Sequence, residues 1–338
     1  MVPDLLEIRN LRIEATSYPP GEPPRDVVLV DDVSVSVAKG KVLGLIGESG
    51  AGKSTIGLSA MAYGRGGVRL TGGEILLNGR DIRTAAPDKL RALRGREVTY
   101  VAQSAAAAFN PARKLMEQVI ETSVAHGVMP KAEAEARARS LFRQLGLPNP
   151  ETFGNRYPHQ VSGGQLQRAM TAMALCPKPD LVIFDEPTTA LDVTTQIEVL
   201  RAFRRVVRER QATAVYVSHD LAVVAQMADH ILVLRGGKAQ EVNTTARILA
   251  EPAHDYTKSL LAAARPAPLQ GTHEQHLTLL NASPRIFERD GVQPSLDGNT
   301  VDADTERAAY GRAALEYRAS LSFIESKVRT MLSAITGQ

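Results

Sequence analysis

The segment from Gly47 to Ser54 has the residue types and spacing of a phosphate-binding loop: Gly47-Glu48-Ser49-Gly50-Ala51-Gly52-Lys53-Ser54. Its glycines let main-chain N–H groups turn inward around the β- and γ-phosphates, at the positive end of a following helix. Lys53 supplies a mobile cation to the same oxygens, and the Ser54 hydroxyl can bind Mg²⁺. The alternative is a glycine-rich hairpin with an exposed lysine. An apolar run before the loop and a helical stretch after it favour nucleotide binding by the loop and Thr55.

Two adjacent carboxylates, Asp185 and Glu186, follow the short apolar run 181–184. Acids at the carboxyl end of a central strand lie beside the phosphate site of a parallel sheet. We expect Asp185 to hold Mg²⁺, directly or through water, and Glu186 to polarise the attacking water. Strands often end in solvated acids, so the pair gains its meaning from the phosphate-binding loop in the same chain.

A second anion-binding pattern lies far from the first, where Ser162, Gly163 and Gly164 open a helix predicted to run from Gln165 to Leu175. The alternative is an ordinary helix cap. One nucleotide does not need two cradles from one chain. The sequence therefore predicts a head-to-tail dimer in which each ATP lies between the loop of one chain and the serine-glycine cap of another.

The elements that must position these residues alternate along the chain. Residues 5–46 and 73–78 are predicted to be β-rich, residues 53–62 helical, and residues 88–175 mainly helical, with a clear helix at 131–145. Beyond them, the apolar runs 181–184, 213–217 and 230–234 alternate with helical stretches at 194–210 and 220–228, which predicts a parallel sheet in an α/β core.

The composition of the 338 residues is that of a soluble globular protein, with 43% hydrophobic and 23% charged residues. A net charge of +3 is too small to argue for nucleic acid. Cys176 is the only cysteine, which excludes an intramolecular disulfide and a cysteine-rich metal site and fits a reducing compartment. We see neither a signal peptide nor a run of about 18 apolar residues, so we expect any membrane role to come through partners.

Taken together and in this order, the motifs resemble the nucleotide-binding subunit of an ABC transporter over residues 5–261. Residues 47–54 resemble Walker A, 181–186 Walker B, and 161–165 the family signature. The resemblance implies that Gln103 is the Q-loop glutamine, which senses Mg²⁺ and water and couples to membrane subunits. It further implies that Asp192 belongs to the D-loop and that His219 contacts the γ-phosphate. The implied fold is a P-loop core with an antiparallel β subdomain and a helical signature subdomain at about 88–175.

A narrower resemblance, to importers of the oligopeptide and dipeptide branch, is carried by residues 47–55, 109–111 and 252–261. The last segment reads His254-Asp255-Tyr256-Thr257, where that branch reads HPYT. The resemblance implies an ATPase, with ATP and Mg²⁺, that energises uptake of peptides or related small solutes. Its implied partners are two permease subunits, a second ATPase (a paralogue or a second copy), and an extracytoplasmic solute-binding protein, with no nucleic acid. The implied location is the cytoplasmic face of the inner membrane, as a peripheral protein.

Two features depart from the family pattern. Many relatives carry a cysteine cluster for an iron–sulfur centre in the extension that here spans residues 262–338, but this extension has no cysteine, so we expect none. The family also stacks an aromatic residue on adenine, and counting back from the Walker A strand reaches Pro24 and Arg25 instead. Tyr18 is the nearby aromatic, and its stacking on adenine is a hypothesis.

Other functions were weighed against this one. A nucleic-acid-associated ABC ATPase would carry long coiled coils, zinc-binding cysteine pairs or tandem cassettes, and this sequence shows none of them. A P-loop kinase explains neither residues 161–165 nor His219. An ABC exporter often fuses its ATPase to membrane segments. The transported substrate and the choice between homodimer and heterodimer stay open. So does the role of residues 270–338, where 303–335 are predicted to be helical.

Overall fold

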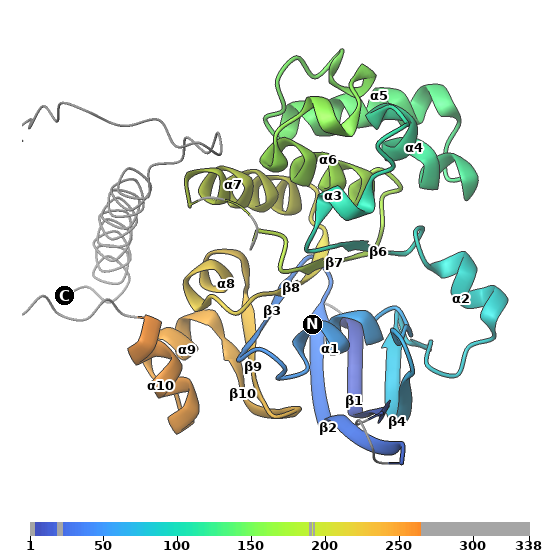
Figure 1. Ribbon diagram of the computed structural model, residues 1–338. Coiled ribbons are helices and arrows are strands. Elements are labelled where there is room, and N and C mark those ends of the chain that lie inside the picture. The colour runs from blue at the N-terminus through green and yellow to red at the C-terminus, as the bar shows by residue number, and fades with distance from the viewer. Residues whose placement is uncertain (1–3, 19–22, 189–190, 192, 265–338) are drawn as a thin grey trace, which may run out of the picture. The chain divides into compact units, whose positions relative to one another are not determined.

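The computed structural model describes residues 4–18, 23–188, 191 and 193–264 (Figure 1). The predicted helices at 303–335 and the D-loop residue Asp192 lie outside these residues. Across the described part of the chain, no helix has the length and hydropathy needed to cross a membrane.

The first sheet is antiparallel and has the strand order β2-β1-β4-β5. Its second strand shows why the sequence forms it: Val33, Val35 and Val37 are buried while the serines between them are exposed. Alternation of this kind is typical of a sheet with one face on the core. The predicted β-rich region is confirmed, although β4 begins five residues before the predicted residue 73. The strands are β1 (Asp4–Ser17), β2 (Arg25–Ala38), β4 (Val68–Leu77) and β5 (Arg80–Asp81).

The second sheet carries the functional motifs and has the order β10-β9-β3-β8-β7-β6. All neighbouring strands are parallel except β10, which is antiparallel to β9. The predicted parallel sheet is therefore confirmed. Strand β6 lies within the stretch that the sequence predicted to be helical. The strands are β3 (Val42–Gly47), β6 (Val98–Val101), β7 (Leu181–Asp185), β8 (Thr213–Val217), β9 (His230–Arg235) and β10 (Lys238–Thr244).

The helices for which the sequence predicted a range agree with it to within three residues, whereas α9 and α10 were not predicted. The long helices α5 and α7 begin and end within one residue of prediction, whereas α1 ends three residues early and α6 begins two residues early. The helices of the described chain are α1 (Lys53–Ser59), α2 (Pro87–Leu93), α3 (Ala105–Ala108), α4 (Leu115–Ala125), α5 (Lys131–Gln144), α6 (Gly163–Leu175), α7 (Val193–Glu209), α8 (Leu221–Met227), α9 (Thr245–Ala250) and α10 (Asp255–Ala264), with 3₁₀ turns at Phe153–Asn155 and Pro158–Gln160.

Each face of the parallel sheet packs into a separate hydrophobic core. On β8, Tyr216 belongs to one core, and Val215 and Val217 belong to the other. The core that contains Tyr216 includes the buried faces of α4 to α8, and the other includes α1 and the antiparallel sheet. Consequently α1 and α6 lie on opposite sides of the sheet (Figure 1).

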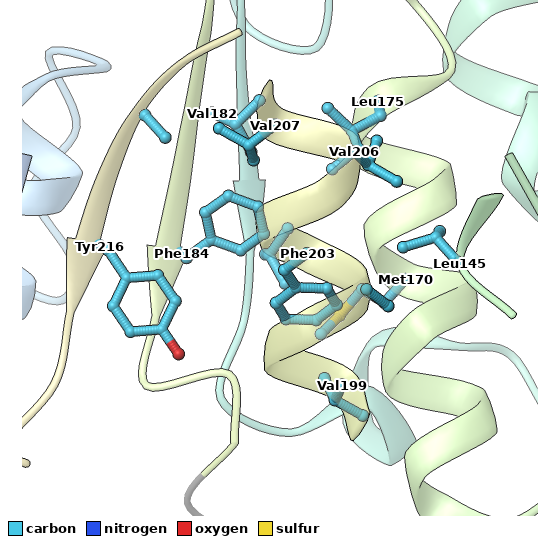
Figure 2. Close-up of a cluster of buried hydrophobic side chains, with 14 of the residues drawn as sticks. Leu145, Met170, Leu175, Val182, Phe184, Val199, Phe203, Val206, Val207 and Tyr216 are labelled. Atoms are coloured by element: carbon cyan, nitrogen blue, oxygen red, sulfur yellow. The ribbon is translucent and has the colours of Figure 1, made fainter. Parts of the chain in front are cut away.

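Aromatic side chains join the parallel sheet to α7. Phe203 of α7 is fully buried and stacks on Phe184 of β7 with ring centroids 5.3 Å apart. Phe184 in turn lies 5.9 Å from the ring of Tyr216 on β8. Figure 2 shows Phe203 between these strands and Met170 of α6. The packing fixes the strand β7 that ends in the two acids.

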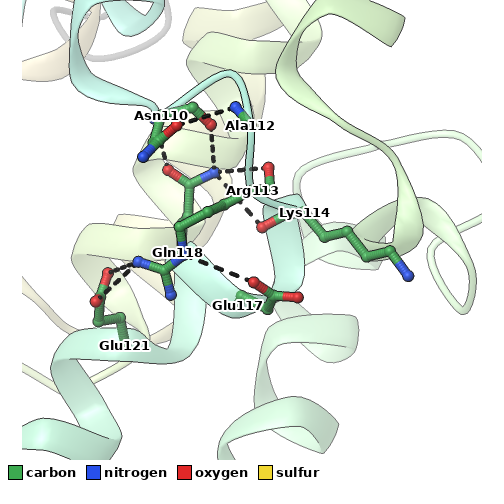
Figure 3. Close-up of polar contacts among 7 residues, drawn as sticks. All are labelled: Asn110, Ala112, Arg113, Lys114, Glu117, Gln118 and Glu121. Atoms are coloured by element: carbon green, nitrogen blue, oxygen red, sulfur yellow. Dashed lines mark hydrogen bonds and ion pairs between the residues drawn. The ribbon is translucent and has the colours of Figure 1, made fainter.

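A buried glutamine holds the segment between α3 and α4. Gln118 of α4 is 6% exposed, and its Oε1 accepts a hydrogen bond of 2.7 Å from the N–H of Asn110. Its Nε2 donates to the carbonyl oxygens of Asn110 and Arg113, each at 3.0 Å (Figure 3). Arg113 also pairs with Glu121 at 3.0 Å on the surface. One side chain thus fixes the turn that follows Gln103.

Candidate functional site

The glycine-rich loop lies where the sequence predicted it, between β3 and α1. Lys53 is 5% exposed, and its Nζ donates hydrogen bonds of 2.8 Å to the carbonyl oxygens of both Gly47 and Glu48. Burial lowers the pKa of Lys53, and the carboxylates of Glu186 and Asp185 oppose that shift. The ammonium group is therefore held at the loop with two carboxylates close by.

The neighbouring strands press closely on the loop. A Cβ at Gly47 would lie 2.1 Å from the carbonyl oxygen of Leu234 on β9, so no larger residue fits there. The N–H of Gly237, between β9 and β10, donates to the carbonyl oxygen of Ala51 at 3.3 Å. The carbonyl of Gly237 accepts from the N–H of Asp31 on β2 at 2.9 Å. The β9–β10 turn thus bridges the loop and the antiparallel sheet.

The predicted magnesium residues meet directly. Ser54 of α1 donates its hydroxyl to Asp185 Oδ1 at 2.7 Å, although 131 residues separate the two. The second oxygen, Oδ2, accepts a hydrogen bond of 2.6 Å from the hydroxyl of Tyr100 on β6. Asp185 is 8% exposed. A hydroxyl and a carboxylate beside a phosphate loop are oxygen ligands of the kind that Mg²⁺ takes when phosphates and water complete its octahedron. These residues therefore fit magnesium.

Glu186 lies at the centre of the predicted catalytic residues. Its φ angle is +46°, and its N–H donates to the carbonyl oxygen of Val217 at 3.0 Å. Left-handed backbone in a residue other than glycine is uncommon and concentrates at functional sites. Gln103 Nε2 donates to Glu186 Oε2 at 3.4 Å, and His219 Nδ1 lies 3.5 Å from Glu186 Oε1. The structure thus brings Gln103, Glu186 and His219 together at the carboxyl ends of β6, β7 and β8.

The serine-glycine cap begins α6 and is paired within itself. The Ser162 hydroxyl accepts from the N–H of Gln165, and Gln165 Oε1 accepts from the N–H of Ser162, both at 3.3 Å. A Cβ at Gly164 would lie 2.2 Å from Thr195 Cγ2, which shows how closely α7 packs on this end of α6. Because α1 and α6 pack into different cores, the cap belongs to the opposite side of the sheet from α1. The fold therefore does not bring the phosphate-binding loop (residues 47–54) and the cap (residues 162–165) together on one face of the sheet.

Tyr18 is not among the residues that the structure brings to the loop. It follows the last residue of β1 and is 76% exposed. The β1–β2 hairpin touches the loop farther back, where a Cβ at Gly52 would lie 3.2 Å from Val30 Cγ2, and Val30 pairs with Ile13. Tyr18 lies five residues after Ile13, a separation of about 16 Å in an extended strand. Stacking of Tyr18 on adenine stays a prediction.

The segment that departs from the HPYT pattern is anchored beside the loop. Glu241 of β10 accepts hydrogen bonds of 3.0 Å from the N–H groups of Ala253 and His254. Tyr256 is 6% exposed, with the guanidinium of Arg235 4.9 Å from its ring centroid. Burial raises the pKa of Tyr256. The main chain of Glu48 in the loop lowers this pKa, and the Glu48 carboxylate raises it. Residues 253–256 therefore pack against the β9–β10 turn that borders the loop.

One residue of the site, Tyr100, and one residue that supports a nearby turn, Gln118, were not predicted from the sequence. Tyr100 lies three residues before Gln103, but only the pairing of β6 with β7 brings its hydroxyl to Asp185. Gln118 supports the turn after Gln103 from the next helix. A glutamine among the apolar residues of a helix is a weak signal of such a support. For Tyr100 the sequence offers no comparable signal, because the local sequence does not determine which strands are neighbours in the sheet.

Comparisons with known proteins agree with this geometry. The sequence pattern of the ABC transporter family matches residues 30–189. The chain is 35% identical over 284 residues to the dipeptide transport ATP-binding protein DppD of Bacillus subtilis, covering 83% of this chain and 82% of that protein. It is 38% identical over 230 residues to the oligopeptide transport ATP-binding protein OppD of Lactococcus lactis, covering 68% of each.

Further similarity extends to another import system and to solved structures. The metal-staphylopine import system ATP-binding protein CntD of Staphylococcus aureus is 38% identical over 77% of this chain and 93% of that protein. A dimeric ATP-binding cassette bound to ADP and inorganic phosphate matches with a TM-score of 0.60 and 25% identity, over 71% of this chain and 98% of that one.

Proposed function

The chain belongs to the ABC transporter family, and we propose that it energises the uptake of peptides or related small solutes. It is an ATP-binding and ATP-hydrolysing subunit of that family. The observation that carries the proposed substrate class is its 35–38% identity to proteins named for dipeptide and oligopeptide transport. The relative named for metal-staphylopine import is why related small solutes are included.

Nucleotide binding is assigned to residues 47–55. The main-chain N–H groups of the loop hold the phosphates, and Lys53 Nζ exchanges its bonds to Gly47 and Glu48 for phosphate oxygens. Ser54 and Asp185 are the residues that would hold Mg²⁺, which supplies charge neutralisation on the phosphates when bound. The carboxylates that already face Lys53 support this assignment.

Hydrolysis is assigned to the three side chains at the ends of β6, β7 and β8. Glu186 accepts a proton from the attacking water and orients it in line with the γ-phosphate. His219 donates to a γ-phosphate oxygen, and Gln103 orients the same water. Their mutual contacts of 3.4 and 3.5 Å through Glu186 support a common role.

A second ATPase chain completes each site. The cap at Ser162–Gln165 belongs to the opposite side of the sheet from α1, so a second chain must supply it to the nucleotide. The second chain is either a copy of this one or a paralogue, and Asp192 is assigned to the contact between them. The dimeric cassette with ADP and phosphate supports such an arrangement.

The partners of ABC ATPase subunits include membrane permeases. For this chain we assign two permease subunits and an extracytoplasmic solute-binding protein. The chain itself is assigned to the cytoplasmic face of the inner membrane as a peripheral subunit. The turn that Gln118 fixes after Gln103 is a rigid element through which closure of the ATPases reaches the permeases.

Affinity purification from native membranes tests this function. A tagged chain, solubilised with a mild detergent, should recover two multi-span permeases and a solute-binding protein, identified by mass spectrometry. Recovery of nucleic acid or ribosomal proteins without membrane subunits would overturn the transport assignment while leaving the ATPase chemistry intact.

Uptake by cells tests the substrate class. A strain lacking the chain should lose accumulation of radiolabelled di- and oligopeptides and regain it with the wild-type chain. The Glu186→Gln variant should fail to restore uptake, whereas Glu251→Gln, at an exposed glutamate in the segment after α9, should restore it fully. Unchanged peptide uptake in the deleted strain would refute the peptide assignment.

A further inference from the structure

Tyr100 completes the surroundings of the Walker B aspartate. Its hydroxyl donates a 2.6 Å hydrogen bond to Asp185 Oδ2, while Ser54 donates a 2.7 Å bond to Oδ1 of the same carboxylate. Both oxygens of Asp185 are therefore held by hydroxyl donors, one from the phosphate-binding loop helix and one from the sheet. The two donors lie on different elements: a strand of the sheet holds Tyr100, and the helix after the loop holds Ser54. We therefore treat their roles separately.

The sheet fixes the position of Tyr100. It lies on β6, whose parallel register with β7 pairs Tyr100 with Ile183, two residues before Asp185. Ile183 and Phe184 are fully buried on both sides of β7, so neither strand can slide without unpacking a core. Ser54, by contrast, lies in the first turn of the short helix α1 and is one of the proposed magnesium ligands.

The phenol is held on one oxygen of the carboxylate. Its hydroxyl lies 2.6 Å from Asp185 Oδ2 and donates to it, and this bond fixes the plane of the carboxylate. Oδ1 then stays directed toward Ser54.

We propose that Tyr100 is a positioning residue for the magnesium site, which sets the orientation in which Asp185 and Ser54 present their oxygens to the cation. This inference rests on the proposed assignment of Asp185 and Ser54 to Mg²⁺. Groups that orient a metal ligand commonly change metal affinity by about 10- to 100-fold when they are removed. In this proposal Tyr100 acts on the cation through its hydrogen bond to Asp185.

The structure also offers a matched control. Tyr216 lies on β8, next to β7, and its hydroxyl is buried without a hydrogen-bond partner among the described residues. Tyr100→Phe and Tyr216→Phe each remove one phenolic hydroxyl from the same sheet, on a half-buried residue in the first case and a buried one in the second. Only the first removes a hydrogen bond to Asp185.

The experiment measures cation binding rather than turnover. The full-length protein is saturated with a non-hydrolysable ATP analogue, and Mn²⁺ is titrated in by electron paramagnetic resonance, with Mg²⁺ competing. We expect Tyr100→Phe to weaken Mn²⁺ and Mg²⁺ binding by about 10-fold or more, with analogue affinity in EDTA unchanged. Tyr216→Phe should match the wild type in both measurements. A cation affinity for Tyr100→Phe within twofold of wild type would overturn the proposal.

Two further outcomes are decisive. If analogue affinity in EDTA falls together with cation affinity, Tyr100 supports the fold of the loop instead, and the proposal is refuted. Asp185→Asn separates the inference from the site assignment: an unchanged cation affinity in that variant refutes the role of Asp185 itself. If Asp185→Asn weakens the cation, adding Tyr100→Phe should then have no further effect, because the two residues act through one interaction.

Discussion

Replacing Glu186 with glutamine tests the assignment of the catalytic base with the least disturbance to the structure. The amide keeps the shape of the side chain and an oxygen that can accept from Gln103 Nε2, now at 3.4 Å. It removes the negative charge that lies 3.5 Å from His219. The left-handed backbone at this position, with φ of +46°, is the same for both residues and adds no new strain.

The expected magnitudes separate chemistry from stability. The His219 side chain is 56% exposed and its contact with Glu186 is long, so we expect the free energy of unfolding to change by less than about 1 kcal/mol. Loss of a catalytic acid–base group costs about 100-fold or more in rate. At about 1.36 kcal/mol for each factor of ten, that is about 2.7 kcal/mol in the activation barrier. A loss of stability below about 1 kcal/mol is too small to lower turnover 100-fold through unfolding, so a drop of that size reports on the chemical step.

The assay measures phosphate release by the assembled transporter at saturating MgATP, together with ATP affinity by calorimetry and the melting temperature. We expect Glu186→Gln to bind ATP as the wild type does and to turn over at least about 100-fold more slowly. Glu251→Gln should be normal in all three measurements. Turnover within threefold of wild type would refute the role of Glu186, and an equal loss of ATP affinity would reassign it to binding.

Three further predictions concern the elements that support the site. Gln118→Leu removes three hydrogen bonds to the main chain of the 110–113 turn and should lower the free energy of unfolding by about 2–3 kcal/mol in urea titrations; a loss below about 0.5 kcal/mol would contradict it. Phe203→Ala should cost about 3–5 kcal/mol in the same titration, because the ring is fully buried against Phe184, and a cost under about 1 kcal/mol would refute that packing. Burial acts to raise the pKa of Glu241, but main-chain N–H donors lower it below its ordinary 4.5, so its stabilising effect is present above that pH and is lost as pH falls through the folded pKa. The melting temperatures of wild type and Glu241→Gln should therefore differ at pH 7 and converge as the pH falls below 4.5 and through the folded pKa; a constant difference would contradict this linkage.

The parallel core could be predicted because its strands are buried on both faces. Strand β8, Thr213–Val217, is buried at every position and has no polar residue at its centre, so its limits agree with the apolar run. Strand β10 was missed for the opposite reason: it is an edge strand with mostly exposed or half-buried residues, and its sequence KAQEVNT has no apolar periodicity. Strand β6 was missed because four residues between helical stretches are too short for a periodic signal.

Some residues of the candidate site could be predicted from the sequence, and others depend on the order of strands in the sheet. Asp185 is the last residue of β7, His219 follows the end of β8, and Lys53 begins the helix after the loop that follows β3. A parallel sheet therefore brings the three to one edge whatever the strand order. The contact between Tyr100 and Asp185 needs β6 to be the neighbour of β7, which is a property of the whole fold. The stacking of Tyr18 on adenine stays a prediction: Tyr18 directly follows β1 and is exposed.

The proposed role of the α6 cap as half of a nucleotide site comes at little cost to the single chain. Its two internal hydrogen bonds, between Ser162 and Gln165, are both 3.3 Å long and lie at an exposed helix end. Bonds of this length and exposure contribute at the lower end of the usual 0.5–1.5 kcal/mol each. Exchanging them for charged phosphate oxygens, which form bonds roughly twice as strong, is therefore favourable when a nucleotide arrives on another chain. The capping box keeps the helix end satisfied in the single chain, and in the proposed dimer the same N–H groups turn to the partner's nucleotide.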